Sequence, residues 1–329
     1  MVRRKIAIVG AGQIGSRHLQ ALAKLEGEVF IQVVDSSSEA LQLARARFTD
    51  VSRSDKSNIT VEYLNIIDEM DDSFDVIIVA TNSNVRRIVA EELLNKKQCK
   101  HLILEKVVFQ SCEDFADISE LLIENNVRAW VNCPRRMWTI YHYLHNKLKH
   151  AENVSYCVSG AGQGIIGSNG IHYIDSFSHL TGETDIAFCS KLLDEKLTPS
   201  KRQGFVEFTG VLEGVTESGK QIKLSCYATG NAPIMVNIDS EVLRCIIIEE
   251  AGTAWISEEC NNWKWEEMKF LAAYQSQLTN IVVEQLIETG GCDLTSFEVS
   301  RKLHEMLLNS LMEYLFRNHK GRFTICPIT

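Results

Sequence analysis

The stretch Lys5-Ile-Ala-Ile-Val-Gly-Ala-Gly-Gln-Ile-Gly15 decides the fold of the N-terminal part of this chain. Its apolar residues 6–9 predict a short buried strand, and a helical pattern follows the glycine-rich residues 10–15. Gly10 would permit a tight turn, Gly12 would let the backbone approach a pyrophosphate, and Gly15 would let the helix pack on the strand. Because the first amides of a helix and its dipole attract phosphate, the stretch predicts a dinucleotide-binding turn.

An acidic residue ends the second predicted strand, Val29–Asp35, twenty residues after Gly15. A carboxylate at this position can accept hydrogen bonds from both ribose hydroxyls of an adenosine, and it would repel a 2′-phosphate. We therefore expect NAD in preference to NADP, although the hydroxyls of Ser36–Ser38 could tolerate a phosphate. The alternative is a glycine turn without a ligand, beside an ordinary aspartate at the end of a strand.

Short apolar strands alternate with helical stretches through the first part of the chain. No proline precedes Pro134, and the further predicted strands are Val61–Leu64, Val76–Ala80, His101–Glu105 and Ala129–Asn132. Near-continuous apolar strands separated by helices are typical of a parallel sheet that is covered on both faces. We therefore expect residues 1–130 to form a doubly wound Rossmann domain that binds the dinucleotide.

The second part of the chain has a different pattern. A run of strands is predicted from about Gly204 to Trp265 without intervening helices, and two helices, near Phe270–Glu288 and Thr295–Asn318, follow it. This order indicates an α+β domain over residues 131–329, with a large, mostly antiparallel open sheet, for substrate binding and oligomerisation. Because such a sheet exposes one face unless something covers it, we expect a homodimer or homotetramer formed through it.

The composition is that of an ordinary globular protein and excludes several classes. The chain has 329 residues, 45% of them hydrophobic, and its 34 basic and 43 acidic side chains give a net charge of −9. An acidic chain repels phosphate backbones, so nucleic-acid binding is disfavoured. No apolar run reaches the ~18 residues of a membrane span. The ten cysteines form no CxxC pair and no zinc-ligand spacing with histidines, so we expect reduced thiols, a cytoplasmic location and no metal.

Two polar segments follow predicted strands of the first domain, at the edge where ligands bind in such sheets. The first is Thr81-Asn-Ser-Asn84, and the second is Glu105-Lys106. The ammonium of Lys106 could hydrogen-bond a hydroxyl or a developing oxyanion beside a nicotinamide. Each segment also has an ordinary interpretation, which is a capping turn before a helix for the first and a surface ion pair for the second.

A third polar segment lies on a predicted helix, Ile171–Leu180, after the glycine-rich residues 160–170. His172, Asp175 and His179 lie at i, i+3 and i+7 and therefore share one face. Asp175 and His179 can touch, and a carboxylate raises the pKa of an imidazole, which gives a base near neutral pH. Such a base could take the hydroxyl proton of an alcohol while hydride leaves the same carbon. The alternative is a solvated Asp–His pair.

Together these elements resemble the Gfo/Idh/MocA family of glucose–fructose oxidoreductases, inositol dehydrogenases and rhizopine-catabolism oxidoreductases. The matching residues are Gly10–Gly15 with His18 in the opening loop and helix, Val79–Asn84 in the turn after the fourth strand, Glu105-Lys106 at the start of a Glu-Lys-Pro motif, Asn132 with Arg135 and Arg136 at the start of the second domain, and the pair Asp175 and His179. The resemblance spans nearly the whole chain, and the order and spacing of these groups make it specific.

The resemblance implies a role for each matching residue. Lys106 would hydrogen-bond the reacting hydroxyl, His179 would be the general acid and base, and Asp175 would orient His179 or bind a substrate hydroxyl. The residues implied to contact the dinucleotide are Gly10, Gly12, Gln13, Ile14, Asp35, Thr81, Asn82 and Glu105. Members of the family commonly oxidise or reduce one carbon of a sugar, polyol or sugar nucleotide.

The sequence departs from the family pattern in several places. Val107 replaces the proline that helps to fix the lysine, Asn82 stands where a proline is common, and Arg86 stands where a histidine is common. An arginine at position 86 could reach a phosphate or an anionic substrate, and Arg135 and Arg136 give the same indication. Arg136 is therefore a candidate for substrate binding. His172 is a second candidate, because it adds an imidazole that could share the role of His179.

The sequence thus predicts an oxidoreductase that transfers a hydride between NAD(H) and a carbon of a sugar, polyol or sugar nucleotide. Two other functions stay open. One is a non-catalytic NAD-binding sensor of the same fold, which Val107 favours and the intact set of Lys106, Asp175 and His179 disfavours. The other is an NAD-dependent lyase or glycosidase that oxidises its substrate transiently.

Overall fold

The computed structural model describes residues 3–52, 58–162, 164–319 and 321–329, and the chain divides into two units. The first unit consists of Met1–Phe109, Glu113–Pro134 and Ala273–Phe297, and the second of Gln110–Cys112, Arg135–Ala272 and Glu298–Thr329. This division differs from a single boundary at residue 130, because a late segment of the chain returns to the first unit. The segment contains helix α7 (Gln275–Thr289), which packs on helix α1 (Gln13–Leu22).

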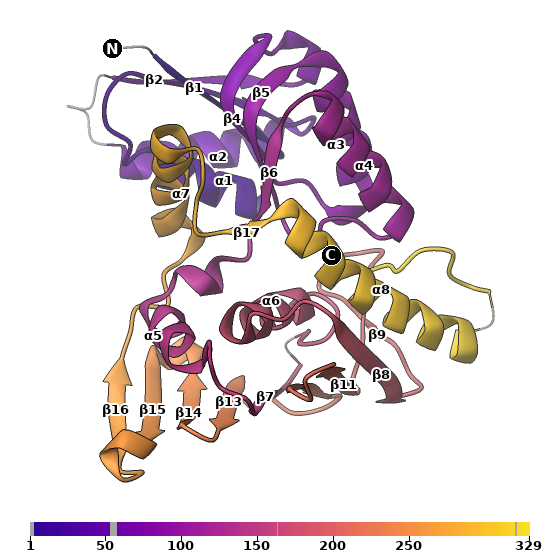
Figure 1. Cartoon of the computed structure of the whole chain (residues 1–329). Helices are drawn as coiled ribbons and strands as arrows, with labels where there is room; N and C mark the ends of the chain where they lie inside the picture. The colour runs from indigo at the N-terminus through magenta and orange to yellow at the C-terminus, as the bar shows by residue number, and fades with distance from the viewer. Residues whose placement is uncertain (1–2, 53–57, 163, 320) are drawn as a thin grey trace. The chain divides into compact units, whose positions relative to one another are not determined.

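The first unit contains a seven-stranded sheet in the order β17-β6-β5-β4-β1-β2-β3 (Figure 1). Strands β1 to β6 are parallel, and the short β17 pairs antiparallel with β6, so the predicted parallel sheet is confirmed. The strands are β1 Arg4–Val9, β2 Val29–Val34, β3 Ile59–Leu64, β4 Ser73–Val79, β5 Gln98–Leu104, β6 Arg128–Val131 and β17 Thr295–Ser296. The strand order reverses between β1 and β4, which is where such sheets bind ligands.

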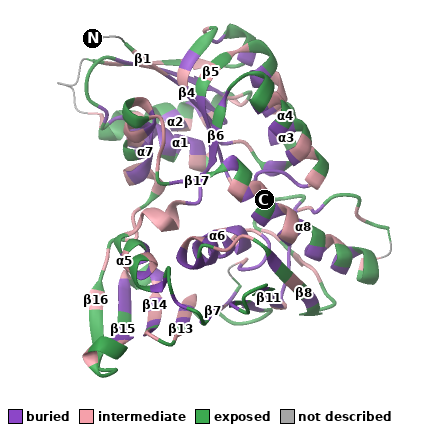
Figure 2. Cartoon of the chain, in the orientation of Figure 1, coloured by how far each residue is buried: buried purple, intermediate pink, exposed green. Residues whose placement is uncertain are grey.

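Helices cover both faces of this sheet. In Figure 1, α1, α2 (Ser38–Val51) and α7 lie on one face, and α3 (Ser83–Lys96) and α4 (Cys112–Glu124) lie on the other. A strand between two helical layers must be apolar on both sides, and Ile6, Ala7 and Ile8 of β1 are fully buried. Figure 2 shows the same buried strands between helices with exposed outer surfaces.

The second unit contains an eight-stranded sheet in the order β16-β15-β14-β13-β7-β12-β11-β8. Its strands are β7 Val154–Ala161, β8 Ile186–Leu193, β11 Gly210–Thr216, β12 Gln221–Tyr227, β13 Met235–Ser240, β14 Leu243–Ile248, β15 Thr253–Glu258 and β16 Trp265–Lys269. The pairing is antiparallel except between β7 and β12, so the expected mostly antiparallel sheet is confirmed. Strands β7 and β8 were not predicted from the sequence, although β7 alternates buried and half-buried residues as a strand does.

One face of this sheet is covered by a helix that the sequence predicted. Helix α6 (Gly170–Thr181) packs on β7 and β12 and against α5 (Thr139–Leu148). The unit also contains α8 (Phe297–His319), and Leu307 of α8 approaches Gly170 at the start of α6. The predicted helix Ile171–Leu180 is therefore confirmed.

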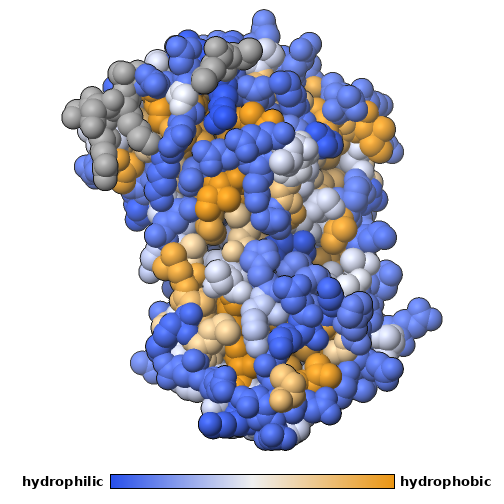
Figure 3. All heavy atoms as spheres, turned by 60° about the vertical axis from the view of Figure 1, so that its left-hand side comes forward, coloured by the Kyte–Doolittle hydropathy of each residue, from blue (hydrophilic) through white to orange (hydrophobic). Residues whose placement is uncertain are grey.

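The opposite face of the eight-stranded sheet carries the more exposed residues of its strands. Cys157 of β7 is half-buried, while Lys223 of β12 and Trp255 of β15 are exposed. Figure 3 shows one side of the molecule, on which hydrophilic residues cover most of the surface and apolar residues are interspersed. Across the described ranges, no helix combines the length and the apolar character needed to cross a membrane.

Candidate functional site

The glycine-rich turn between β1 and α1 has the geometry that its sequence predicts. Gly10 has a φ of +97°, and a Cβ there would lie 2.7 Å from the backbone nitrogen of Thr81. A Cβ at Gly15 would lie 1.8 Å from the carbonyl oxygen of Gly10, so packing alone requires both glycines. A Cβ at Gly12 would meet nothing within 4 Å. Packing therefore does not explain Gly12, and its open side leaves room for a ligand beside the backbone.

The N-terminus of α1 begins at this open position. Gly12 is its N-cap, no side chain caps it, and its first turn, which contains Gln13 and Ile14, has no acidic residue. The first amides of α1 are therefore not bound by a capping side chain and can bind a phosphate. Arg47 of α2 donates to Oε1 of Gln13 at 2.7 Å and to Oγ of Ser16 at 2.6 Å, an arrangement that the sequence analysis missed.

Asp35 lies beside the same turn, directly after β2. Its Oδ2 accepts a hydrogen bond from the amide of Ala11 at 2.7 Å, and its Oδ1 accepts from the amide of Ser37 at 2.8 Å. The two bonds fix the carboxylate at the carboxyl end of β2, next to the glycines. This is the position at which an acidic residue binds the ribose of a dinucleotide.

Thr81 and Asn82 follow β4 at the adjacent strand end. The hydroxyl of Thr81 is buried and has no hydrogen-bond partner among the residues that the structure describes. Asn82 is the N-cap of α3, but its side chain makes no capping bond. A buried polar atom without a partner indicates an absent ligand or water. Together with Gly12, the start of α1 and Asp35, Thr81 gives a set of groups that fits a dinucleotide.

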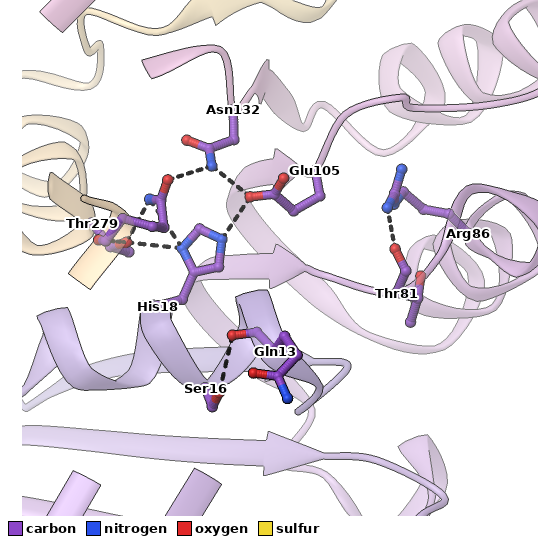
Figure 4. A network of polar contacts seen from close by, with 9 residues as sticks. Gln13, Ser16, His18, Thr81, Arg86, Glu105, Asn132 and Thr279 are labelled. Atoms are coloured by element: carbon purple, nitrogen blue, oxygen red, sulfur yellow. Dashed lines mark hydrogen bonds and ion pairs between the residues drawn. The ribbon is translucent and has the colours of Figure 1, made fainter. Parts of the chain in front are cut away.

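Glu105 follows β5 and is bound by other residues of the first unit (Figure 4). Its side chain is 6% exposed, and its Oε1 accepts hydrogen bonds from Nε2 of His18 at 2.8 Å and from the side-chain amide of Asn132. Burial would raise the pKa of this carboxyl, but the hydrogen bonds from His18 and Asn132 and the charges of His18 and Arg86 lower it below its ordinary value. Glu105 is therefore ionised inside the protein.

Helix α7 completes this buried network. Thr279 of α7 lies 2.8 Å from Nδ1 of His18, and Gln275 accepts a hydrogen bond from Asn132 at 2.7 Å. His18 was noted in the sequence as part of the opening helix, but its bond to Glu105 was not predicted. No sequence signal connects Gln275 and Thr279 to the strand ends, because they come from a segment more than 140 residues after Asn132.

Arg86 of α3 does not reach out toward an anion, contrary to the sequence interpretation. The residue is 2% exposed, and its guanidinium donates to the backbone carbonyls of Thr81, Val107 and Val108. Figure 4 shows the guanidinium directed at Thr81. The expectation that Arg86 binds a phosphate or an anionic substrate is wrong, because the guanidinium is buried and both of its terminal nitrogens donate to backbone carbonyls of the first unit.

Asp175 of α6 pairs with Arg136 rather than with His179. The carboxylate is 1% exposed and accepts two hydrogen bonds, from Nη2 of Arg136 at 2.8 Å and from Nε at 3.0 Å. Arg136 belongs to the short helix Pro134–Met137, just before α5. A planar guanidinium matches a carboxylate with two parallel bonds, and an imidazole four residues along the helix cannot.

His179 is held among other histidines. Its ring stacks on that of His145 at 4.4 Å with an interplanar angle of 12°, and His142 lies edge-on at 6.5 Å. Burial, together with the charges of Arg136, His145 and His142, lowers the pKa of His179 to about 3. The expectation that Asp175 raises this pKa is therefore wrong. His179 is neutral at neutral pH, and among the described residues its Nε2 has no hydrogen-bond partner.

The remaining predicted residues also lie in the second unit. His172 is in the first turn of α6, as its spacing predicted. Arg135 pairs with the buried Glu249, with Nε 2.8 Å from Oε1, and its guanidinium lies over the ring of Tyr173 at 4.4 Å. Glu249 and Tyr173 therefore engage Arg135, which does not support its proposed contact with an anionic substrate.

The structure thus forms two groups of predicted residues, one within each unit. The first unit brings together the strand-end residues Gly10, Gly12, Gln13, Ile14, Asp35, Thr81, Asn82, Glu105 and Lys106. The second unit holds Arg136, His172, Asp175 and His179 on α6 and the short helix before α5. Within the part of the chain that the structure describes, no three His, Cys, Asp or Glu side chains group as metal ligands.

Comparison with known families identifies the first group. Residues 4–133 match the family described as "Oxidoreductase family, NAD-binding Rossmann fold", which is the Gfo/Idh/MocA family. The match spans all six parallel strands of the first unit and the glycine-rich turn. No curated protein matches the chain by sequence.

Solved structures with the same fold cover both units. An oxidoreductase from Agrobacterium radiobacter in complex with NAD+, L-tartaric acid and magnesium has a TM-score of 0.69 at 15% identity, over 98% of each chain. The WlbA dehydrogenase from Bordetella pertussis in complex with NADH and UDP-GlcNAcA has a TM-score of 0.66 at 17% identity, over 100% of this chain and 99% of that chain. Biliverdin reductase from Synechocystis in complex with biliverdin and NADP+ has a TM-score of 0.66 at 11% identity, over 94% and 98%.

Proposed function

We propose that this chain, whose NAD-binding Rossmann fold belongs to the Gfo/Idh/MocA oxidoreductases, transfers a hydride between NAD(H) and a carbon of a sugar, polyol or sugar nucleotide. The observation that carries the cofactor assignment is the set formed by the open side of Gly12, the uncapped start of α1, the fixed carboxylate of Asp35 and the orphan hydroxyl of Thr81. Asp35 favours NAD over NADP, because a carboxylate repels a 2′-phosphate.

The substrate class rests on two residues and on one structural neighbour. WlbA, which has this fold, binds NADH and UDP-GlcNAcA. Another protein of this fold binds biliverdin and NADP+, so the fold alone does not select an alcohol. Interconversion of an alcohol and its ketone uses one group that stabilises charge on the oxygen and one group that exchanges the hydroxyl proton. We assign the first role to the half-exposed Lys106 after β5 and the second to the neutral His179 on α6.

Each candidate residue has a distinct role in this proposal. Bound NAD supplies the hydride acceptor or donor. Lys106 places an ammonium on the substrate oxygen and stabilises its developing negative charge. His179, which is neutral, takes the hydroxyl proton on an imidazole nitrogen and releases it to solvent, because its low pKa does not allow it to keep a proton at neutral pH. Asp175 holds Arg136, and Arg136 in turn helps to keep His179 unprotonated.

Two further residues are proposed to bind the substrate. Arg136 uses Nε and Nη2 for Asp175, which leaves Nη1 as the donor for an anionic or hydroxyl group of the substrate. His172, one turn of α6 away from Asp175, is the second proposed contact. Both assignments predict an increase in KM on substitution, with NAD binding unchanged.

The proposal is tested with a panel of sugars, sugar acids and UDP-sugars, by following NADH formation or consumption. A substrate that the wild type turns over, and that Lys106→Ala and His179→Ala do not, would support it, provided that both variants still bind NADH. Full turnover by both variants would refute these roles. NADH binding without turnover of any compound would favour a sensor, and exchange of solvent deuterium into a substrate without net NADH would favour a lyase.

We also propose a homodimer or homotetramer formed through the more exposed face of the eight-stranded sheet. Val215, Tyr227 and Trp255 expose apolar side chains on the strands of this sheet, at 44%, 54% and 36%, and a second copy of the sheet would bury them. Light scattering on the wild type and on Val215→Asp tests this, because a charge in a self-complementary contact enters it twice. A monomeric wild type would contradict the proposal. All ten cysteines are thiols, which fits the proposed cytoplasmic location.

A further inference from the structure

We propose that Arg86 is a positioning residue for Lys106. Its guanidinium binds backbone carbonyls in the turn that follows β4 and in the turn that follows β5, and the second of these turns carries Lys106. This inference rests on the proposed function, in which Lys106 touches the substrate oxygen. Arg86 itself is buried, so it acts through the groups packed around it and above all through the backbone that it binds.

The first observation is the pattern of burial around Lys106. Residues 101–109 are all buried except Lys106, which is half-buried. Glu105 is 5% exposed, and Val107 and Val108 are fully buried. The turn after β5 is thus packed into the first unit on both sides of one accessible cation. A lysine side chain is flexible, so its reach is set by how firmly the flanking backbone is held.

The second observation is that both flanks are fixed by hydrogen bonds. On the N-terminal side, the carboxylate of Glu105 accepts from His18 and Asn132. On the C-terminal side, Nη1 of Arg86 donates to the carbonyls of Val107 and Val108, the latter at 3.1 Å. Lys106 is the residue between these two anchors, and a shift in either anchor would move its side chain.

The third observation is that the same guanidinium also holds the neighbouring strand end. Nη2 of Arg86 donates to the carbonyl of Thr81, at the carboxyl end of β4. The amide of Thr81 packs against Gly10 of the dinucleotide turn. Arg86 therefore connects the backbone that meets the cofactor with the backbone that carries Lys106, and it sets the distance between them.

The chemistry of the side chain explains why an arginine stands here. A guanidinium has five donors in a rigid plane and can bridge three carbonyls at once, whereas an ammonium is a single point. Burying a cation is unfavourable unless hydrogen bonds satisfy it, so a purely space-filling role would select an apolar residue. The charge also acts on Glu105, whose pKa Arg86 helps to lower.

The first experiment needs no substrate. The NADH-loaded protein is labelled with acetic anhydride, and mass spectrometry compares acetylation of Lys106 with that of Lys100, which is 72% exposed. In Arg86→Gln we expect the labelling of Lys106 relative to Lys100 to rise about three- to tenfold, because the turn is no longer held. The matched control is Arg87→Gln, since Arg87 is the next residue and makes surface ion pairs with Glu91 and Asp117. An unchanged ratio in folded Arg86→Gln would overturn the proposal.

The second experiment measures coupling between the two residues. With a substrate from the panel and saturating cofactor, Arg86→Gln should lower kcat about 10- to 100-fold, as a misplacement of about 1 Å does, with little change in the KM for the substrate. In a Lys106→Ala background, the same substitution should have no further effect on kcat. An equal loss in both backgrounds would mean that Arg86 is only structural. If Arg86→Gln fails to fold, Arg86→Lys retains the buried charge and serves in both experiments.

The two proposals can fail separately. If Lys106→Ala keeps full turnover, the proposed function is wrong, whatever the labelling of Lys106. If Lys106→Ala is inactive but Arg86→Gln changes neither labelling nor kcat, the function stands and the positioning role of Arg86 is wrong.

Discussion

Glu105 in the first unit and Asp175 in the second are both buried carboxylates next to a proposed catalytic group, but they act in different ways. Glu105 precedes Lys106 in the chain and is held by His18 and Asn132, so it fixes the backbone of the lysine. Asp175 lies one helical turn before His179 and binds Arg136. It acts on the histidine through the charge of that arginine, which lowers the pKa of His179. A buried acid can thus supply either geometry or electrostatics.

The largest expected effect tests the first of these arrangements. Lys106→Ala removes the proposed oxyanion donor from a turn that stays in place, and we expect kcat to fall about 10²- to 10³-fold with unchanged NADH affinity. Stopped-flow or steady-state NADH absorbance measures the loss, and NADH fluorescence titration measures binding. Lys100→Ala is the control, because this lysine is exposed and, among the residues that the structure describes, its ammonium forms an ion pair with Asp75 alone. A loss of NADH binding equal to the loss of kcat would place Lys106 in cofactor binding instead.

A smaller effect is expected on stability when the charge of Glu105 is removed and its shape is kept. Glu105→Gln leaves an amide among partners arranged for a carboxylate, and we expect the free energy of unfolding to fall by about 1–3 kcal/mol. The folded pKa of Glu105 is below its ordinary value, so its contribution is present above pH ~4.5 and is lost as the pH falls through the folded pKa. Urea unfolding at neutral and acid pH should therefore show less acid sensitivity in the variant than in the wild type. Equal acid sensitivity of the two proteins would show that Glu105 is not ionised in the fold.

The next effect concerns a carboxylate that is accessible to a ligand. Asp35 is fixed by the amides of Ala11 and Ser37, and we expect Asp35→Ser to lose about tenfold in NADH affinity while NADPH affinity rises. Fluorescence titration with both cofactors gives the ratio. Glu62→Ser, on the adjacent strand β3, is the control, and it should leave the ratio unchanged. A wild type that already prefers NADPH would contradict the role given to Asp35.

The smallest effect tests the electrostatics of the second unit. The charge of Arg136 lowers the pKa of His179, so Arg136→Gln should raise that pKa above its wild-type value of about 3. NMR titration of the imidazole protons measures the shift. Because the folded pKa is depressed, the wild type loses stability as the pH falls from 6.5 toward 3, where the unfolded histidine binds a proton and the folded one does not. A His179 that titrates near pH 6.5 in the wild type would contradict the arrangement.

Local motifs in the sequence were sufficient to predict much of the first unit. The glycines, Asp35 and the apolar strands are all recognisable within short windows, because turn geometry and burial on both faces restrict which residues can stand there. The helix that carries His172, Asp175 and His179 was also predicted, since its spacing is local. Strand β8 was missed because its buried and exposed residues do not alternate regularly, and β7, which does alternate, was missed because it runs directly into the glycine-rich residues 160–170.

The partners of individual side chains could not be predicted in the same way. Spacing along α6 allows Asp175 to reach His179, but it gives no indication that Arg136 offers two better-aligned donors. Arg86 was interpreted as a cation for an anionic ligand, because a sequence does not show which carbonyls lie within reach of a buried guanidinium. The segment that contains Gln275 and Thr279 was assigned to the second domain, although it belongs to the first unit.

The sequence by itself determined the parallel sheet, the dinucleotide turn and the set of residues able to do acid–base chemistry, since each follows from short-range sterics and periodicity. Only the tertiary structure decided which carboxylate binds which cation, and hence that His179 is neutral and that Lys106 stands on a fixed turn. The physical reason is that burial and charge act through space. A pKa or a side-chain position depends on every group packed around it, and most of those groups come from distant parts of the chain.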